Sequence, residues 1–168
     1  MEHNLNDTEA IKKLKELAMD IDIALFCTNL KIDDGATCRP MSTQGVDDNG
    51  TLWFFSAKDS DKNKDIMQDK HVQLFYSHPG NMNFMVVNGT AEILFDKDKT
   101  EELWSPLVKT WFQGGKDDPN LSLIKVTPVS AYYWDTKGSK MINFFKMIAS
   151  VATGKTLVDA QEGSLNVM

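Results

Sequence analysis

The chain has 168 residues, of which 42% are hydrophobic, so it can fill one sizeable core but is short for two independent domains. Lysine and arginine total 18 against 24 acidic residues, and the net charge of −6 argues against nucleic acid or an anionic membrane as a partner. Charges run throughout Met1–Asp20, and no later stretch is apolar enough to span a bilayer, so we expect a cytoplasmic protein.

The first predicted element is an amphipathic helix. Apolar residues recur at helical spacing from Ile11 to Ile21, and Asn6 with Glu9 forms a plausible N-terminal cap. The pattern then changes to short apolar runs separated by turn residues, which is typical of an antiparallel meander. The predicted strands are Ile23–Thr28, Thr37–Val46 and Thr51–Ser56.

A short helix is predicted over Asp61–Lys70, where charged residues surround a few apolar anchors. The strands His71–Ser77 and Phe84–Phe95 follow it. Within the second strand, Asn88-Gly89 predicts a β-bulge, and such bends help to close small barrels.

Another helix is predicted to begin at Asp98, which can cap it together with Glu101. It carries apolar residues as far as Trp111, and Pro106 is expected to kink it or to shift its start.

A polar loop, Gln113–Asn120, leads into a long strand, Leu121–Asp135, that we expect to bend at Pro128. A final helix is predicted over residues 141–152, and the polar residues 153–168 are expected to form a poorly ordered tail. The order of elements predicts one domain over residues 1–152, a mainly β barrel of about six antiparallel strands with peripheral helices.

Two cysteines, Cys27 and Cys38, lie in predicted strands without a cluster of Cys or His nearby. The sequence therefore predicts neither a metal site nor a structural disulfide. It also contains no glycine-rich dinucleotide fingerprint, nucleophile elbow or pair of catalytic carboxylates.

Arg39 is the single arginine beside 17 lysines, which suggests that this position needs a rigid planar donor. The alternative is an ordinary strand residue paired with an acid. Pro40 cannot donate to a β-ladder, so it predicts an edge or irregular strand whose backbone is open to a ligand.

A second candidate site is the run Trp53–Lys64, which includes Phe55 and Ser56 and in which an apolar strand leads into hydroxyls, lysines and a helix start. Such donors suit a phosphate, and the adjacent aromatic residues suit a planar ring. The alternative is that Ser60 merely caps the helix and that Lys62 and Lys64 are solvated. An anion site also requires the carboxylates that flank Ser60 to face solvent.

Several motifs in this order resemble the FMN-binding split β-barrels of the pyridoxamine 5'-phosphate oxidase-like superfamily. These motifs are Arg39-Pro40-Met41, Leu52-Trp53-Phe54-Phe55-Ser56, Ser60-Asp61-Lys62 and Asn88-Gly89-Thr90-Ala91-Glu92. The runs Trp111–Pro119 and Ala131–Asp135 resemble the general stress protein branch in particular.

The resemblance implies a six-stranded antiparallel split barrel that forms a homodimer, with FMN, or alternatively FAD, at the subunit interface. By position, Arg39 and the backbone of Pro40, Met41 and Ser42 would meet the isoalloxazine or ribityl group. Phe55 would lie beside the flavin, and Ser56, Ser60 and Lys62 would hold its phosphate. Trp134 matches a flavin-contact tryptophan, which either the same or the other subunit would supply.

Departures from the true oxidases limit what the resemblance implies. Asp61 stands at the place of a phosphate-binding arginine, and Phe84 replaces a flavin-contact glutamine. After Trp134 the chain reads Thr136-Lys137-Gly138-Ser139-Lys140, without the element that binds the vitamin B6 substrate. The resemblance therefore does not extend to vitamin B6 oxidation.

The sequence favours an FMN-dependent oxidoreductase with a small-molecule substrate and electron donor that it does not identify, and with no assignable catalytic acid or base. The alternative is a non-enzymatic flavin-binding or stress-sensing protein, which turnover with NADH or NADPH would distinguish. A third class, an oligonucleotide-binding barrel, would need basic grooves that the acidic composition disfavours.

Overall fold

The computed structural model describes residues 5–31, 33, 35–136 and 160–166. Within these residues, no helix is both long and apolar enough to cross a membrane. The helix predicted over residues 141–152 lies outside the described residues.

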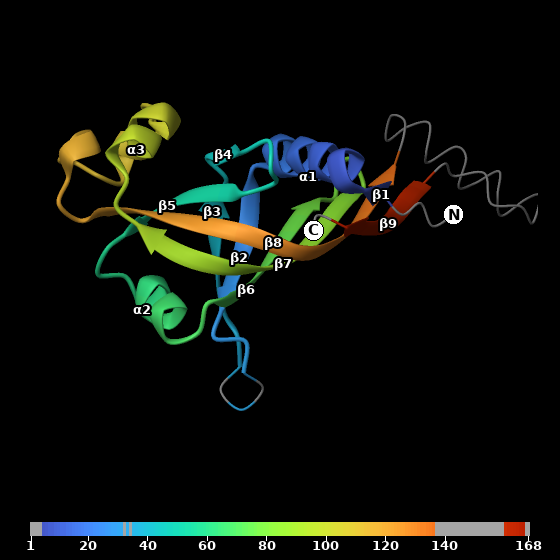
Figure 1. The fold of residues 1–168 in the computed structure, drawn as a ribbon, viewed down its shortest axis with the longest axis horizontal. Coiled ribbons are helices and arrows are strands. Elements are labelled where there is room, and N and C mark those ends of the chain that lie inside the picture. The colour runs from blue at the N-terminus through green and yellow to red at the C-terminus, as the bar shows by residue number, and fades with distance from the viewer. Residues whose placement is uncertain (1–4, 32, 34, 137–159, 167–168) are drawn as a thin grey trace, which may run out of the picture.

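A curled antiparallel sheet forms most of the molecule (Figure 1). Its barrel strands are β2 Ile23–Thr28, β3 Thr37–Ser42, β4 Gly45–Val46, β5 Leu52–Ala57, β6 His71–His78, β7 Asn83–Leu94 and β8 Leu121–Thr136. Strands β3 and β4 together cover the single strand predicted over Thr37–Val46. The predicted split-barrel fold and its antiparallel pairing are confirmed. Two additional strands, β1 Leu5–Asn6 and β9 Ala160–Asn166, bring the sheet to nine strands.

The barrel is split between β3 and β4, because these two consecutive strands pair with different neighbours. Strand β3 pairs with β2, whereas β4 pairs with β5. Between them, the Thr43 amide donates to the Asp22 carbonyl at 3.0 Å and the Gln44 amide donates to the Trp53 carbonyl at 2.8 Å. Because β5 also pairs with β8, and β8 with β7, the strands curl into a barrel that stays open between β3 and β4.

Helix α1 Asp7–Ile21 closes the core, as its apolar spacing predicts. Its buried face carries Ala10, Leu14, Leu17 and Ala18, which pack with the inward-facing residues of the strands. Lys13 on the same helix forms an ion pair with Asp135 of β8. The helix is therefore fixed to the barrel by both apolar burial and charge.

The predicted bulge in β7 is confirmed by a shift of register between Asn88 and Gly89 opposite β8. Gly89 faces Pro128 across the strands, at the bend expected in β8. A Cβ atom at Gly89 would lie 2.6 Å from the Thr127 carbonyl oxygen, which is backbone and has little room to move. The close approach of the two strands therefore requires glycine here.

The helix expected to run from Asp98 toward Trp111 is shorter and begins earlier. It is α3, Lys97–Leu103, and its N-cap is Asp96, whose side chain accepts a hydrogen bond from the Lys99 amide at 3.0 Å. Two short 3₁₀ turns, Val108–Thr110 and Gly115–Asp117, follow. The helix ends ahead of Pro106, since proline lacks an amide donor and restricts the residue before it.

The expectation of a poorly ordered tail is wrong for residues 160–166. They form β9, which pairs antiparallel with Ala131–Thr136 of β8 and parallel with β1. Polar residues dominate β9, so its sequence has little strand character of its own. Backbone pairing with the open edge of β8 supplies its order, and such a long-range contact leaves no local pattern.

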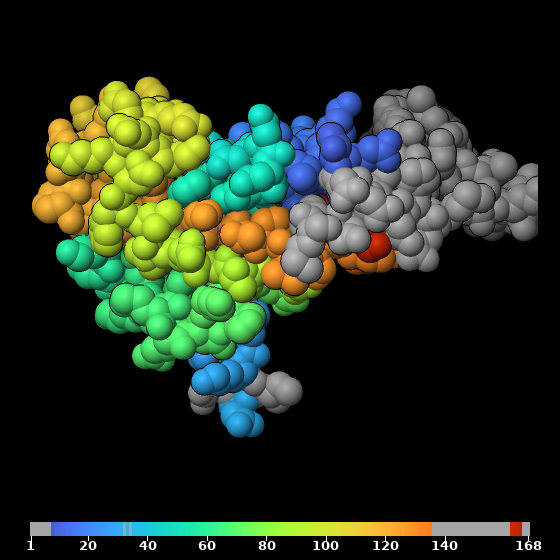
Figure 2. Space-filling view, in the orientation of Figure 1, coloured from blue at the N-terminus to red at the C-terminus, as the bar shows by residue number. Residues whose placement is uncertain are grey.

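The prediction of no disulfide is also wrong. Cys27 and Cys38 form one, with Cα atoms 4.1 Å apart. They are directly opposite one another in the β2–β3 hairpin, whose described end residues project from the rest of the molecule in Figure 2. They are eleven positions apart along the chain, and only the register of the hairpin brings them together.

We predict that Gly89→Ala lowers the free energy of unfolding by about 1–3 kcal/mol, because overpacking against fixed backbone is destabilising. Urea unfolding of the two purified proteins measures the difference. Gly80→Ala is the control, since its Cβ would meet only the His78 side chain and should change stability by less than about 0.5 kcal/mol. Equal stability of Gly89→Ala and the parent protein would contradict the proposed close approach.

Candidate functional site

Arg39 lies on β3, the last strand in the order of the main sheet. The prediction that Pro40 marks an edge strand is therefore confirmed. On β3 the side chains alternate between faces, so Arg39 and Met41 point inward while Cys38 and Pro40 point outward. The guanidinium group of Arg39 is consequently on the inner face of the edge strand β3.

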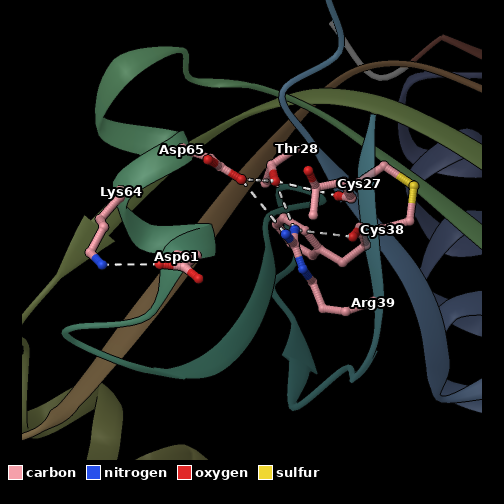
Figure 3. Close-up of polar contacts among 9 residues, drawn as sticks. Cys27, Thr28, Cys38, Arg39, Asp61, Lys64 and Asp65 are labelled. Carbon is pink, nitrogen blue, oxygen red and sulfur yellow. Dashed lines mark hydrogen bonds and ion pairs between the residues drawn. A yellow bond between two sulfur atoms is a disulfide. The ribbon is translucent and has the colours of Figure 1, made fainter. Parts of the chain in front are cut away.

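A network of polar contacts holds Arg39 against helix α2, Asp61–Gln68 (Figure 3). Its Nη1 donates to Thr28 Oγ1 at 2.8 Å, and the Thr28 hydroxyl donates to Asp65 Oδ2 at 2.6 Å. The Nη2 atom of Arg39 lies 3.7 Å from the same carboxylate oxygen. Burial lowers the pKa of Arg39, and the negative charge of Asp65 opposes this shift.

Ser60 precedes the first turn of α2 as its N-cap residue, but its side chain makes no capping hydrogen bond. Within the described residues, Ser60 Oγ is the one buried side-chain oxygen or nitrogen without a hydrogen-bond partner. A buried hydroxyl without a partner is unfavourable by about 1–3 kcal/mol, so it indicates a place for a polar ligand. The alternative reading of Ser60 as a simple cap is not what the structure has.

Lys62, two residues further on, is half-buried close to Arg39. Burial lowers the pKa of its ammonium group, and the positive charge of Arg39 lowers it further. Two cations thus face each other at the start of α2, where the helix also presents its free amides. We call Arg39, Ser60, Lys62 and the first turn of α2 the α2 corner. This group of residues is suited to an anion.

The two acidic residues that flank Ser60 do not oppose an anion. Asp59 and Asp61 are exposed, as the anion-site hypothesis requires. Asp61 pairs with Lys64 at 3.0 Å, and in Figure 3 this pair lies apart from the Arg39 network. The carboxylate that replaces an arginine of the true oxidases is therefore turned to solvent.

Ser56 differs from Ser60, because its hydroxyl is already engaged. It donates to Asn63 Oδ1 at 2.9 Å and lies 2.8 Å from Ser122 Oγ, and all three residues are buried. A phosphate contact from Ser56 would require this bond to break. In the structure Ser56 fixes α2 to β5 and β8.

Sequence reasoning missed Asn63 and Ser122, which complete that network. Asn63 Nδ2 donates to Ser122 Oγ at 3.0 Å. The signal for Asn63 was its spacing of three residues from Ile66, since both are buried on one face of α2. Ser122 gave no comparable signal in a strand of apolar neighbours.

The remaining candidates of β3 and β5 offer less to a ligand. Met41 is buried in the core, and Ser42 Oγ donates to Asp22 Oδ1 at 2.6 Å. Phe55 is half-buried and its ring makes an edge contact with Trp104 at 5.9 Å. Pro40 is exposed on the outer face. Along Pro40–Ser42, β3 pairs with β2 on one side only, and the Ser42 carbonyl accepts a hydrogen bond from Gln44 Nε2 at 3.1 Å.

Trp134 does not join this cluster within one chain. It lies on β8, is 41% exposed and pairs with Phe84 of β7. Three strands, β2, β6 and β7, separate β8 from β3 in the sheet order. Trp134 therefore belongs to another surface of the protomer.

That surface is an apolar row on the outer face of the sheet, which we call the outer belt. Cross-strand pairs place Leu25 beside Phe75, Phe75 beside Val86, and Val86 beside Tyr132. Its members, with the neighbouring row, are Ile23, Leu25, Phe75, Phe84, Val86, Tyr132 and Trp134. Contiguous exposed apolar surface of this kind marks an interaction site.

Comparison with known proteins identifies the family. The family model described as "Pyridoxamine 5'-phosphate oxidase like" matches residues 9–159. The chain is also 30% identical over 112 residues to Protein bli-3 of Neurospora crassa. That match covers 61% of this chain and 51% of bli-3, so the chain spans about half the length of this curated relative.

Solved structures show the same fold. A candidate general stress protein 26 from Jannaschia sp. CCS1 has a TM-score of 0.78 at 24% identity, over 94% of this chain and 98% of that one. The general stress FMN/FAD binding protein from Xanthomonas citri has a TM-score of 0.65 at 28% identity, over 77% and 90%. The chain therefore belongs to the pyridoxamine 5'-phosphate oxidase-like family, and the resemblance to its general stress protein branch is confirmed.

Proposed function

We propose that this protein is an FMN-binding flavoprotein that transfers electrons to or from a small molecule. The observation that carries the proposal is the buried, unpaired hydroxyl of Ser60 beside the half-buried cations Lys62 and Arg39. A phosphate monoester supplies the negative charge and the acceptor oxygens that these groups lack. The name of the Xanthomonas citri relative, an FMN/FAD binding protein, agrees with this choice of ligand.

Each residue of the corner has a distinct part in holding the phosphate. Ser60 Oγ donates a hydrogen bond, Lys62 supplies a charge, and the first amides of α2 contribute the positive end of the helix. Ser56 acts through Asn63, because their hydrogen bond fixes the angle at which α2 leaves β5. The carboxylate of Asp65 on α2 holds the guanidinium group of Arg39 in place through their ion pair.

The flavin ring would lie along the edge strand β3. There one edge of β3 does not pair with another strand, and its backbone would be available to a planar heterocycle. Bound FMN would supply the electron transfer, and the protein orients it and tunes its electrostatics. Arg39, whose charge is partly balanced by Asp65, would favour negative charge on a nearby ring.

We further propose that two copies associate through the outer belt, with the flavin at their interface. Ile23, Leu25 and Phe75 are all more than one-third exposed on this face, which is unusual for such large apolar side chains together. In such a dimer Trp134 of one copy would approach the ring bound by the other. This would unite Trp134 with a corner that it does not reach within its own chain.

We predict that Ser60→Ala weakens FMN binding by roughly 10- to 100-fold, the effect of losing a hydrogen bond to a charged group. The free energy of unfolding without FMN should be equal or higher, because Ser60 makes no capping bond to lose and its buried hydroxyl has no partner. Flavin fluorescence titration and urea unfolding measure the two quantities. Ser105→Ala, another half-buried serine outside the corner, is the control. Unchanged affinity together with a loss of stability of about 1 kcal/mol would mean that Ser60 is only a cap.

We predict that FMN affinity falls as the pH rises toward about 10.4, the ordinary lysine pKa, and that the fall begins below that value. Burial and Arg39 lower the pKa of Lys62, so its charge is lost at a lower pH than that of an exposed lysine. A bound phosphate favours the protonated amine, and the affinity is therefore highest below the lowered pKa. The Lys62→Gln variant should lose the part of this decline in FMN affinity that comes from Lys62. Riboflavin has the same ring without phosphate, so its affinity for the parent protein should not show that part of the decline. An identical pH profile for Lys62→Gln and the parent protein would exclude Lys62 from the site.

Leu25→Glu should convert the dimer into a monomer, because it places a charge within an apolar interface. Sedimentation equilibrium measures the mass of each protein. Met67→Glu is the matched control, since Met67 is 70% exposed on α2, outside the belt. A monomeric parent protein, or a dimeric Leu25→Glu variant, would be incompatible with the proposed interface.

A further inference from the structure

The disulfide between Cys27 and Cys38 lies directly beside the corner that holds Arg39. The next residue along β2 is Thr28, and the next along β3 is Arg39. Because side chains alternate along a strand, the disulfide is on the outer face of the hairpin and the Arg39–Thr28 hydrogen bond is on the inner face. Figure 3 shows both faces, with the sulfur atoms on one side of β3 and the guanidinium group on the other.

Strand β3 is held from one side at this point. As the last strand of the main sheet, it pairs with β2 alone along Thr37–Ser42. Beyond the two cysteines the strands have one further pair, Thr28 and Thr37, and the Thr28 hydroxyl lies 3.4 Å from the Thr37 carbonyl oxygen. The disulfide is the covalent restraint that acts with these contacts to keep the end of β3, and with it Arg39, against β2 and α2.

The two cysteine residues differ in exposure. Cys38 is exposed, whereas Cys27 is 1% exposed. We therefore expect a thiolate from solvent to attack at Cys38 and to displace the sulfur of Cys27. The Leu25 carbonyl oxygen lies 3.9 Å from Cys27 Sγ and can accept its hydrogen after reduction. The cysteine pair thus has one sulfur for attack and one sheltered leaving group.

We propose that Cys27–Cys38 is a thiol–disulfide exchange site for a dithiol reductant, and that its closed form holds Arg39 in the anion-binding position. A thiolate of the reductant bonds to Cys38 Sγ and releases Cys27, which takes up a proton. The second reductant thiolate then forms a disulfide within the reductant and releases Cys38, which is also protonated. Two electrons pass from the dithiol to the protein. The part that concerns Arg39 rests on the proposed function.

The first experiment needs no flavin. The native protein is treated with dithiothreitol, its free thiols are counted, and amide hydrogen exchange is followed along Thr37–Ser42. We expect two thiols per chain, and exchange at least about tenfold faster than in the oxidised protein. Oxidised glutathione should restore the slow exchange. The Cys27→Ser/Cys38→Ser double variant is the control and should not respond to dithiothreitol. A disulfide that stays closed without denaturant, or unchanged exchange after reduction, would overturn the proposal.

The second experiment compares FMN binding by oxidised and reduced protein. We expect the dissociation constant to rise at least about tenfold on reduction, and that of the double variant to be independent of dithiothreitol. Equal affinity in both redox states would overturn control of Arg39 while leaving the FMN site intact. If FMN binds in neither state, the proposed function fails, and the thiol count and the exchange rates still decide whether the exchange site exists.

Discussion

Two cations held close together are the constraint on which this site depends. Arg39 and Lys62 repel each other in a partly buried setting; Asp65 offsets part of the charge of Arg39, and Asp61 offsets part of the charge of both. Solvent screening is weaker there than at an exposed surface, so the repulsion persists. A doubly charged anion would remove it. The unpaired hydroxyl of Ser60 adds a donor at the same place, which favours phosphate over a simple counter-ion.

The fold makes this arrangement rigid. The chain leaves one side of the barrel and joins the other between β3 and β4, and this change of partner leaves β3 as an edge strand next to α2. Hydrogen bonds among the buried side chains of Ser56, Asn63 and Ser122 fix helix α2 to strands β5 and β8. The groups that would meet a ligand are thus held by residues that would not touch it.

A feature of the fold or the site could be predicted from the sequence where neighbouring residues along the chain determine it. The strand Ile23–Thr28, helix α2 and the bulge at Gly89 follow from periodicity and turn residues, and the structure has them. Strand β9 and the disulfide depend on pairing between distant segments, which leaves no pattern in either segment alone. Arg39, Ser60 and Lys62 were recognisable as candidates from residue type and resemblance. Their joint charge and the missing partner of Ser60 required three-dimensional packing.

The most direct test of the central claim is phosphorus-31 NMR of FMN in the presence of the protein. If the α2 corner holds the phosphate, its resonance should shift and broaden on binding. The second phosphate pKa, about 6 in solution, should fall because the cations favour the dianion. A phosphate signal that keeps the position and titration of free FMN, while the ring is bound, would contradict the account.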